Sequence, residues 1–485
     1  MGDGFISCIK WALEWAGQKK WKLILAVSLV FISICIMIIE PFIFKIIIDE
    51  VLGKHEYEKL IPLLAAAIGV GVTYMLMKYI ISILCEQASQ HAIFDLKSDL
   101  FKRLLPQTNE FYQTHRAGDL ITNMTGDIDL IRHFLSWVIP KWAECIFMIV
   151  IVLTVFISIS PLYALCLFAL TPFTVIFAIQ LAKNVRPAYT EARNQLSILN
   201  TVVQENISGN RVVKAFARED FEIEKFSKEN NEYKARNIRA NSIWLKYNPL
   251  IESISNLLSI VNLVVGGIMV ISGKISLGQL NIFLSLAWAL NDPMVLVGFV
   301  VNDTQRFLAS AEKVMALYYT ENKIVDADNA NEAETLKGNI VFKNVTLKYG
   351  KIKVLDDISF EIKPGEIVGF MGPTGGGKTS LVSLISRFID VTSGSVSIDN
   401  IDVKQYTLQS LRRNIALTMQ DVFLFSDTIE SNIAYGVPEA SMDEVYAAAN
   451  CADADSFISN MPDGYDTIVG ERGTGLSGGQ KQRIS

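Results

Sequence analysis

The chain has 485 residues, which leaves room for two or three domains. Hydrophobic residues make up 51% of it, a share that is high for a soluble protein. A net charge of −6, with no basic block or aromatic–basic stripe, argues against a nucleic-acid partner. The apolar excess lies between Trp21 and about Val301, whereas the sequence from Asn322 onward has the composition of a soluble domain. The composition therefore predicts a membrane region followed by a soluble domain.

Long apolar runs fill the N-terminal part of the chain. A helix needs roughly 20 apolar residues to cross a bilayer. Six stretches reach that length, at residues 23–44, 61–84, 137–158, 162–181, 249–271 and 277–301. A packed soluble core could supply one or two such runs, but not six. We therefore predict an all-α transmembrane domain of six spans within residues 1–319. The first run is too long for the core of a cleaved signal peptide.

The placement of lysine and arginine predicts the orientation of these spans. The segments that follow the second and fourth spans are long and rich in both residues. By contrast, the short segment after the third span has no charge, and the one after the fifth has only Lys274. We expect a multi-pass protein of the cytoplasmic membrane, with its long segments and both of its ends in the cytoplasm.

The two long segments also have a helical pattern. Apolar residues recur at helical spacing in residues 86–134 and 186–246, as in Ile93, Leu96, Leu100 and Leu104. Unstructured loops of this length are uncommon. We therefore expect the membrane helices to continue well beyond the bilayer, with each pair joined by a short turn.

A polar linker at residues 320–338 leads into an α/β domain at residues 339–485. Strand patterns cover residues 339–347, 354–362 and 366–371. The third runs directly into Gly372-Pro373-Thr374-Gly375-Gly376-Gly377-Lys378-Thr379, which fits the phosphate-loop pattern GxxxxGK[ST] between a strand and a helix. Glycines let the backbone N–H groups approach phosphates, while Lys378 can reach the β and γ phosphates and the Thr379 hydroxyl can hold Mg²⁺. A glycine-rich turn with a chance lysine is the alternative, and both the spacing and the preceding strand pattern disfavour it.

A second motif, Leu476-Ser477-Gly478-Gly479-Gln480, lies further along the chain. With the phosphate loop, it resembles the ATP-binding cassette (ABC) family, whose signature is LSGGQ. The resemblance covers nearly the whole chain and is to the exporter branch, in which the membrane domain precedes the cassette. It implies a half-transporter that exports or flips a small or lipophilic substrate by alternating access, with ATP and Mg²⁺ as cofactors.

The resemblance also assigns residues. It implies that Tyr349 stacks on adenine, that Ser380 joins the phosphate loop, and that Gln420 shares Mg²⁺ with Thr379. The signature would face ATP held by a second half-transporter, so the chain must pair. A homodimer is the default and a heterodimer remains open.

Three further segments resemble parts that connect the cassette to the membrane domain. Residues 117–123 and 205–216 resemble the two coupling helices, although Asn123 stands where many members have arginine. Glu471-Arg472-Gly473 matches a loop that contacts the intracellular helices, and a charged surface turn is the alternative.

The chain ends at Ser485, five residues after the signature. The resemblance implies that a complete cassette continues with an Asp that supports Mg²⁺, a catalytic Glu and a switch His. None of the three is present, so we expect the nucleotide-binding domain to be incomplete and the chain to be a fragment of a longer reading frame. We expect the chain to be inactive alone, and no catalytic residue is assigned.

Two rivals remain, an ATP-binding membrane regulator or channel and a soluble-type ATPase tethered to the membrane. Soluble-type ATPases lack six spans and coupling helices, which disfavours the second rival. Nothing in the sequence identifies the substrate. Polar residues in the spans are candidates for a substrate path, with helix–helix hydrogen bonding or snorkelling as the favoured alternative: Lys78, Glu144, Glu252, Asn256, Asn262 and Asp292.

Overall fold

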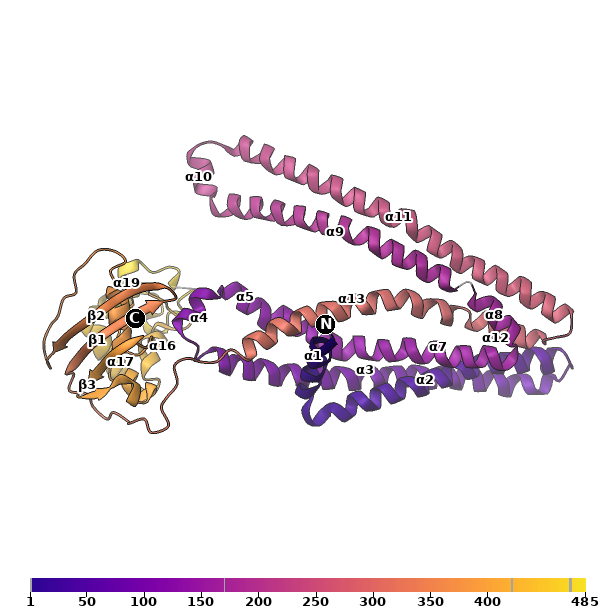
Figure 1. Cartoon of the computed structure of the whole chain (residues 1–485), viewed down its shortest axis with the longest axis horizontal. Coiled ribbons are helices and arrows are strands. Elements are labelled where there is room, and N and C mark those ends of the chain that lie inside the picture. The colour runs from indigo at the N-terminus through magenta and orange to yellow at the C-terminus, as the bar shows by residue number, and fades with distance from the viewer. Residues whose placement is uncertain (1, 170, 420–421, 471–472) are drawn as a thin grey trace. The chain divides into compact units, whose positions relative to one another are not determined.

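The structure is a computed structural model of the chain, and it describes residues 2–169, 171–419, 422–470 and 473–485 (Figure 1). It divides into two compact units. Unit 1 consists of Met1–Pro106 and Tyr112–Glu321, and unit 2 consists of Gln107–Phe111 and Asn322–Ser485. A helical membrane region is thus followed by a sheet-containing domain, which confirms the predicted fold class.

The described part of unit 1 is built from helices, because a backbone in hydrocarbon must satisfy its own hydrogen bonds. Short π-helical turns interrupt them at Ile47–Leu52, Asn123–Asp127 and Phe134–Val138. The α-helices are α1 (Gly2–Trp15), α2 (Lys20–Ile46), α3 (Leu60–Leu104), α5 (Ala117–Thr122), α6 (Ile128–His133), α7 (Ile139–Ile159), α8 (Pro161–Phe168), α9 (Thr171–Ser208), α10 (Asn210–Ala215), α11 (Glu219–Ile271), α12 (Leu277–Leu286) and α13 (Trp288–Tyr318). A further short helix, α4 (Asn109–Thr114), crosses from unit 2 into unit 1.

Several helices are much longer than a bilayer is thick. At 1.5 Å per residue, the 45 residues of α3 extend about 68 Å and the 53 residues of α11 about 80 Å, against roughly 30 Å of hydrocarbon. Helices α9 and α11 run side by side and are joined through α10 (Figure 1). Helices of this length agree with the expectation that the membrane helices continue beyond the bilayer, which stays a prediction.

Three helical stretches of the described chain are long and apolar enough to cross a membrane: Lys20–Leu52, Tyr57–Leu104 and Ala117–Ile159. They contain the first three predicted spans. Shorter apolar helices, Ser259–Ile271 and Leu277–Leu286, fall inside the fifth and sixth. The sixth predicted span is divided, since α12 ends at Leu286 and α13 begins at Trp288. The count of six spans stays a prediction.

A buried aromatic cluster joins four helices of unit 1. The ring of Phe283 lies 4.4 Å from that of Phe156 and 4.0 Å from that of Tyr163. The Tyr163 hydroxyl donates to the carbonyl of Asn262 at 2.5 Å, and the Asn262 amide donates to the carbonyl of Phe283 at 2.9 Å. A Cβ at Gly266 would lie 2.3 Å from the Tyr163 hydroxyl oxygen, so only glycine leaves room for that ring. These hydrogen bonds satisfy the buried polar groups and connect α8, α11 and α12, while the ring contact of Phe156 adds α7 to the cluster.

Unit 2 contains a four-stranded antiparallel sheet of order β2-β1-β3-β4. The strands are β1 (Ile340–Tyr349), β2 (Ile352–Ile362), β3 (Ser393–Ile398) and β4 (Ile401–Asp402). The strands predicted at 339–347 and 354–362 are therefore confirmed. Their alternation places Phe342 and Phe360 opposite each other in the register, with stacked rings 4.4 Å apart.

The third predicted strand, residues 366–371, is wrong: this segment is not part of any described strand. A strand needs a neighbour for its backbone hydrogen bonds. Among the described residues, none pairs with this segment. Phe370 still packs against Phe360, with ring centroids 5.5 Å apart, but Ile367 and Met371 are almost fully exposed.

Two hydrophobic cores hold unit 2 together. The first packs the sheet against α14 (Lys378–Ile385) and α15 (Leu408–Arg413), through residues such as Phe342, Leu384 and Leu411. The second is helical and contains residues such as Ile429, Val445 and Ile458. It is formed by α16 (Ile429–Ile433), α17 (Met442–Cys451), α18 (Asp455–Ile458) and α19 (Gly478–Ile484).

Asp399 closes the hairpin between β3 and β4 and supports a test of the fold. Asp399 and Asn400 have φ of 52° and 66°, as a two-residue hairpin turn requires. Burial raises the pKa of the Asp399 carboxyl, but backbone N–H groups of Asn339, Lys337 and Gly338 outweigh it and hold that pKa below its usual value. A carboxyl group whose pKa is lower in the folded state stabilises the fold at pH values above its unfolded-state pKa. This contribution is lost as the pH falls through the folded-state pKa.

We therefore expect Asp399→Ala to destabilise the sheet by about 1 kcal/mol near neutral pH, a low value because the carboxylate is partly exposed. Hydrogen exchange of the β1 and β3 amides would measure it. The difference should shrink below pH 4 or so, near the unfolded pKa of aspartate. A pH-independent difference would contradict the charge-based part of this account, and Asp399→Asn separates the charge from the turn preference.

Candidate nucleotide-binding site

The phosphate loop depends on glycines at two positions. Gly375 and Gly377 have φ of 82° and 81°, in the left-handed region that other residues rarely adopt. Gly377 is the N-cap of α14, and a Cβ there would lie 2.8 Å from Cδ2 of Leu355 in β2. Gly377 is therefore required both by its backbone conformation and by the close approach of β2.

The Lys378 side chain folds over this loop. Its Nζ donates to the carbonyl oxygens of Gly372 and Pro373, each at 2.8 Å. The Gly376 N–H also donates to the Pro373 carbonyl, at 3.1 Å. The ammonium thus lies at the mouth of the loop, bound to neutral acceptors that a charged phosphate could replace.

The first turn of α14 offers backbone donors to an anion. The first N–H groups of a helix have no partner within the helix, and the N-cap Gly377 makes no side-chain capping bond. Partial positive charge gathers at such an end. Thr379 and Ser380 lie in this turn, and the Thr379 side chain is exposed, as is Thr374 in the loop. The loop therefore fits phosphate, and the Thr379 hydroxyl is a hard oxygen of the type that Mg²⁺ prefers.

Tyr349 ends β1 at a turn near this loop. It pairs with Ile352 across the turn, where Gly350 has φ of 58°. Its side chain is half-buried against the first core. Val354 and Leu355, a few residues further along β2, are the neighbours of Gly377. The predicted adenine-stacking residue therefore lies at the same end of the hairpin as the phosphate loop.

The signature forms the start of α19. Ser477 caps the helix: its hydroxyl accepts from the Gln480 N–H at 3.3 Å, and the Gln480 side chain accepts from the Ser477 N–H at 2.8 Å. Leu476 packs on the second core, and a Cβ at Gly478 or Gly479 would have no atom within 4 Å. The signature thus presents an open glycine backbone. The capping box was missed in the sequence, although S-x-x-Q at a helix start is its usual sign.

The remaining cassette predictions are only partly described. Gln420, Glu471 and Arg472 lie outside the described residues, so the Mg²⁺ role of Gln420 stays a prediction. The coupling segments are helical: α5 covers most of residues 117–123, and α10 lies within 205–216. The structure does not place Lys378 and the signature on one core, because the loop packs on the first core and Leu476 on the second.

Comparison with known families agrees with these motifs. The family profile of the ABC transporter transmembrane region matches residues 23–294, and the ABC transporter profile matches residues 355–485. The chain belongs to the ABC transporter family.

Several curated relatives are similar to this ABC transporter chain over most of its length. The Bacillus subtilis (strain 168) protein described as uncharacterized ABC transporter ATP-binding protein YknU is 38% identical over 93% of this chain and 77% of the relative. The ATP-dependent lipid A-core flippase of Desulfotalea psychrophila is 33% identical over 92% of this chain and 78% of the relative. The putative multidrug export ATP-binding/permease protein YgaD of B. subtilis is 29% identical over 98% of this chain and 83% of the relative.

Three of the six polar residues predicted in the spans of this transporter, Lys78, Glu144 and Asn262, have structural partners. Lys78 pairs with Glu144 at 2.6 Å, and Lys141, which was missed in the sequence despite its i,i+3 spacing to Glu144, pairs with the same carboxylate at 2.8 Å. Asn262 is fully buried in the aromatic cluster. Asp292 is exposed, and the side chains of Glu252 and Asn256 lie outside the described residues.

Replacing Gly377 tests the phosphate loop. Gly377→Ala adds a methyl group at a left-handed residue and 2.8 Å from Leu355, so we expect the loop to distort and nucleotide affinity to fall at least tenfold, corresponding to about 1.4 kcal/mol. Titration with a fluorescent ATP analogue measures it. Gly436→Ala, at a glycine with open surroundings, is the matched control. Equal affinity in the two variants would contradict the assigned loop.

Proposed function

We propose that this chain is one half of an ATP-driven exporter that moves or flips a small or lipophilic substrate across the cytoplasmic membrane. The phosphate loop with Lys378 at its mouth, on a chain that also carries an ABC membrane region, is the observation that supports this most directly. Two of the relatives are described as a lipid A-core flippase and a putative multidrug exporter, which favours a lipophilic substrate. The substrate path proposed here runs through the spans and alternates in access.

The two motifs support a dimer of half-transporters. Each chain has one phosphate loop and one signature, and the two lie on different hydrophobic cores. We propose that the signature of each chain closes over ATP held by the other. A homodimer is the simplest arrangement, and a heterodimer with a related half is the second. The lysine and arginine distribution supports a cytoplasmic location of the cassettes and of the N-terminus.

In the proposed cycle, ATP first binds to the phosphate loop. Backbone N–H groups of the loop and of the first turn of α14 receive the phosphates. Lys378 exchanges the carbonyls of Gly372 and Pro373 for the β and γ phosphates, and Thr379 and Gln420 would hold Mg²⁺, which would neutralise phosphate charge. Closure of the two cassettes then biases a two-state membrane domain through the coupling helices.

The water-positioning carboxylate and the switch histidine implied by the family are not among these residues. We therefore propose that the phosphate loop and the signature bind ATP and that hydrolysis also requires the carboxylate and the histidine of a complete cassette. An ATP-binding regulator or channel is the second candidate, because such a protein would bind ATP at the same loop without transport.

Lys378 provides the decisive test. We expect Lys378→Ala to weaken ATP binding at least tenfold and, in the transporter with a complete cassette, to abolish ATP-dependent uptake of a fluorescent lipid or dye into inverted membrane vesicles, because the phosphate charge loses its ammonium partner. Lys343→Ala, an exposed lysine on β1, is the control and should leave both unchanged. Uptake that persists in Lys378→Ala, despite lost ATP binding, would favour the regulator.

Tyr349 tests the adenine assignment separately. We expect Tyr349→Ala to lower affinity by about 1–3 kcal/mol, the usual contribution of base stacking, and Tyr349→Phe to retain most of it. Competition between ATP and inorganic triphosphate provides the measurement, since triphosphate lacks a base and its binding should be unaffected. Equal losses for both ligands would show that Tyr349 acts on the fold rather than on adenine.

A further inference from the structure

Helix α1 is fixed to unit 1 along one apolar face. Cys8, Trp11 and Ala12 are buried there. The ring of Tyr318 in α13 lies 6.2 Å from that of Trp11 and 5.5 Å from that of Trp15. This aromatic contact holds α1 in one orientation, so the opposite side of the helix faces away from the unit.

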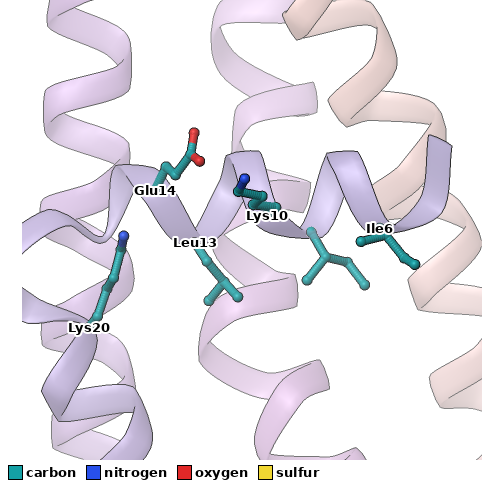
Figure 2. Close-up of a pocket in the computed structure, with 6 residues that line it drawn as sticks. Ile6, Lys10, Leu13, Glu14 and Lys20 are labelled. Carbon is teal, nitrogen blue, oxygen red and sulfur yellow. The ribbon is translucent and has the colours of Figure 1, made fainter. Parts of the chain in front are cut away.

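A second apolar stripe lies on α1 outside this contact. Ile6, Ile9 and Leu13 follow the i, i+3, i+7 spacing of a single helix face. With Lys10, Glu14 and Lys20 they line an open cavity of about 500 Å³ (Figure 2). Ile6 is 65% exposed. Ile9 and Leu13 are half-buried, so the stripe is partly exposed, and an apolar stripe left exposed beside a cavity favours an apolar partner.

The adjoining membrane helix identifies that partner as lipid. Lys20, which lines the cavity, is the first residue of α2, and the stretch that it begins is apolar enough to span a bilayer. Trp21, beside it, is 56% exposed, and exposed tryptophans collect at membrane–water interfaces. The cavity is thus continuous with the surface of a spanning helix, at the level where phospholipid headgroups lie.

The charges at the cavity favour an anionic headgroup. Two ammonium groups, of Lys10 and Lys20, line it against one carboxylate, of Glu14. Lys22 adds positive charge nearby and donates to Gln87 of α3 at 2.6 Å, which ties the start of α2 to unit 1. In Figure 2, Ile6, Lys10, Leu13 and Glu14 follow one another along α1, and Lys20 lies on the adjoining helix beyond Glu14.

We propose that α1 and the first turn of α2 bind an anionic phospholipid, with an acyl chain over Ile6, Ile9 and Leu13 and its phosphate between Lys10 and Lys20. This goes beyond ATP-driven export, because the bound lipid is a resident partner and not the transported substrate.

Native mass spectrometry of the full chain with phosphatidylglycerol or phosphatidylcholine tests the proposal. Each lysine near an anionic surface contributes about a fivefold gain in binding. The Lys10→Gln/Lys20→Gln variant should therefore retain phosphatidylglycerol about 25-fold less well and phosphatidylcholine unchanged, while Glu14→Gln should raise phosphatidylglycerol retention. Ile6→Ser/Leu13→Ser should weaken both lipids.

The control is Lys54→Gln, at an exposed lysine between α2 and α3. Equal retention of phosphatidylglycerol in this control and in the double lysine variant would overturn the proposal. So would a fall in the dimer fraction of Ile6→Ser/Leu13→Ser without any loss of lipid, since a second copy of the chain would then cover the stripe. ATP binding, measured in parallel, should be unchanged in every variant, which separates this test from that of the proposed export function.

Discussion

The hydrogen-bonding needs of a backbone in hydrocarbon set the form of unit 1. No water is available there, so each N–H and C=O must find its partner within the segment, and helices meet that need. The same constraint governs the side chains. In the buried cluster, the Tyr163 hydroxyl donates a hydrogen bond to Asn262, and the Asn262 amide donates one to the carbonyl of Phe283. Lys78 and Lys141 share the carboxylate of Glu144. These polar residues in the spans therefore connect neighbouring helices.

The sequence predicted features that depend on local pattern and missed those that depend on distant neighbours. Strands β1 and β2 follow from alternating residues, and the long helices from apolar spacing. The segment at residues 366–371 has an equally good strand pattern, but strand formation also requires a partner, which a single-segment pattern cannot reveal. Likewise, the left-handed role of Gly377 could be read from GxxxxGK[ST], whereas its contact with Leu355 depends on how β2 packs. The second apolar face of α1 became visible only once its first face was packed.

The conformation of Lys378 explains how the loop can be stable and still ready for ligand. An ammonium without acceptors beside a helix N-terminus would be repelled by the partial positive charge there. The Gly372 and Pro373 carbonyls satisfy it at 2.8 Å. Charge-assisted bonds to phosphate are roughly twice as strong as bonds between neutral groups, so exchanging carbonyls for phosphate oxygens favours the bound state. The exchange needs only a side-chain rotation, because the glycine backbone is already in place.

The length of the helices determines how far a local change at the nucleotide-binding site can be transmitted. A flexible loop between cassette and membrane would absorb a displacement, whereas a continuous helix transmits it. Helix α11 extends about 80 Å, which is about 50 Å more than the roughly 30 Å of hydrocarbon in a bilayer. Since α9 packs along it and α10 joins the two, a force at α10 acts on the pair as one body. In the proposed cycle, this pairing allows cassette closure to reach the spans, and Pro249 inside α11 marks a point where the helix lacks one backbone donor and can bend.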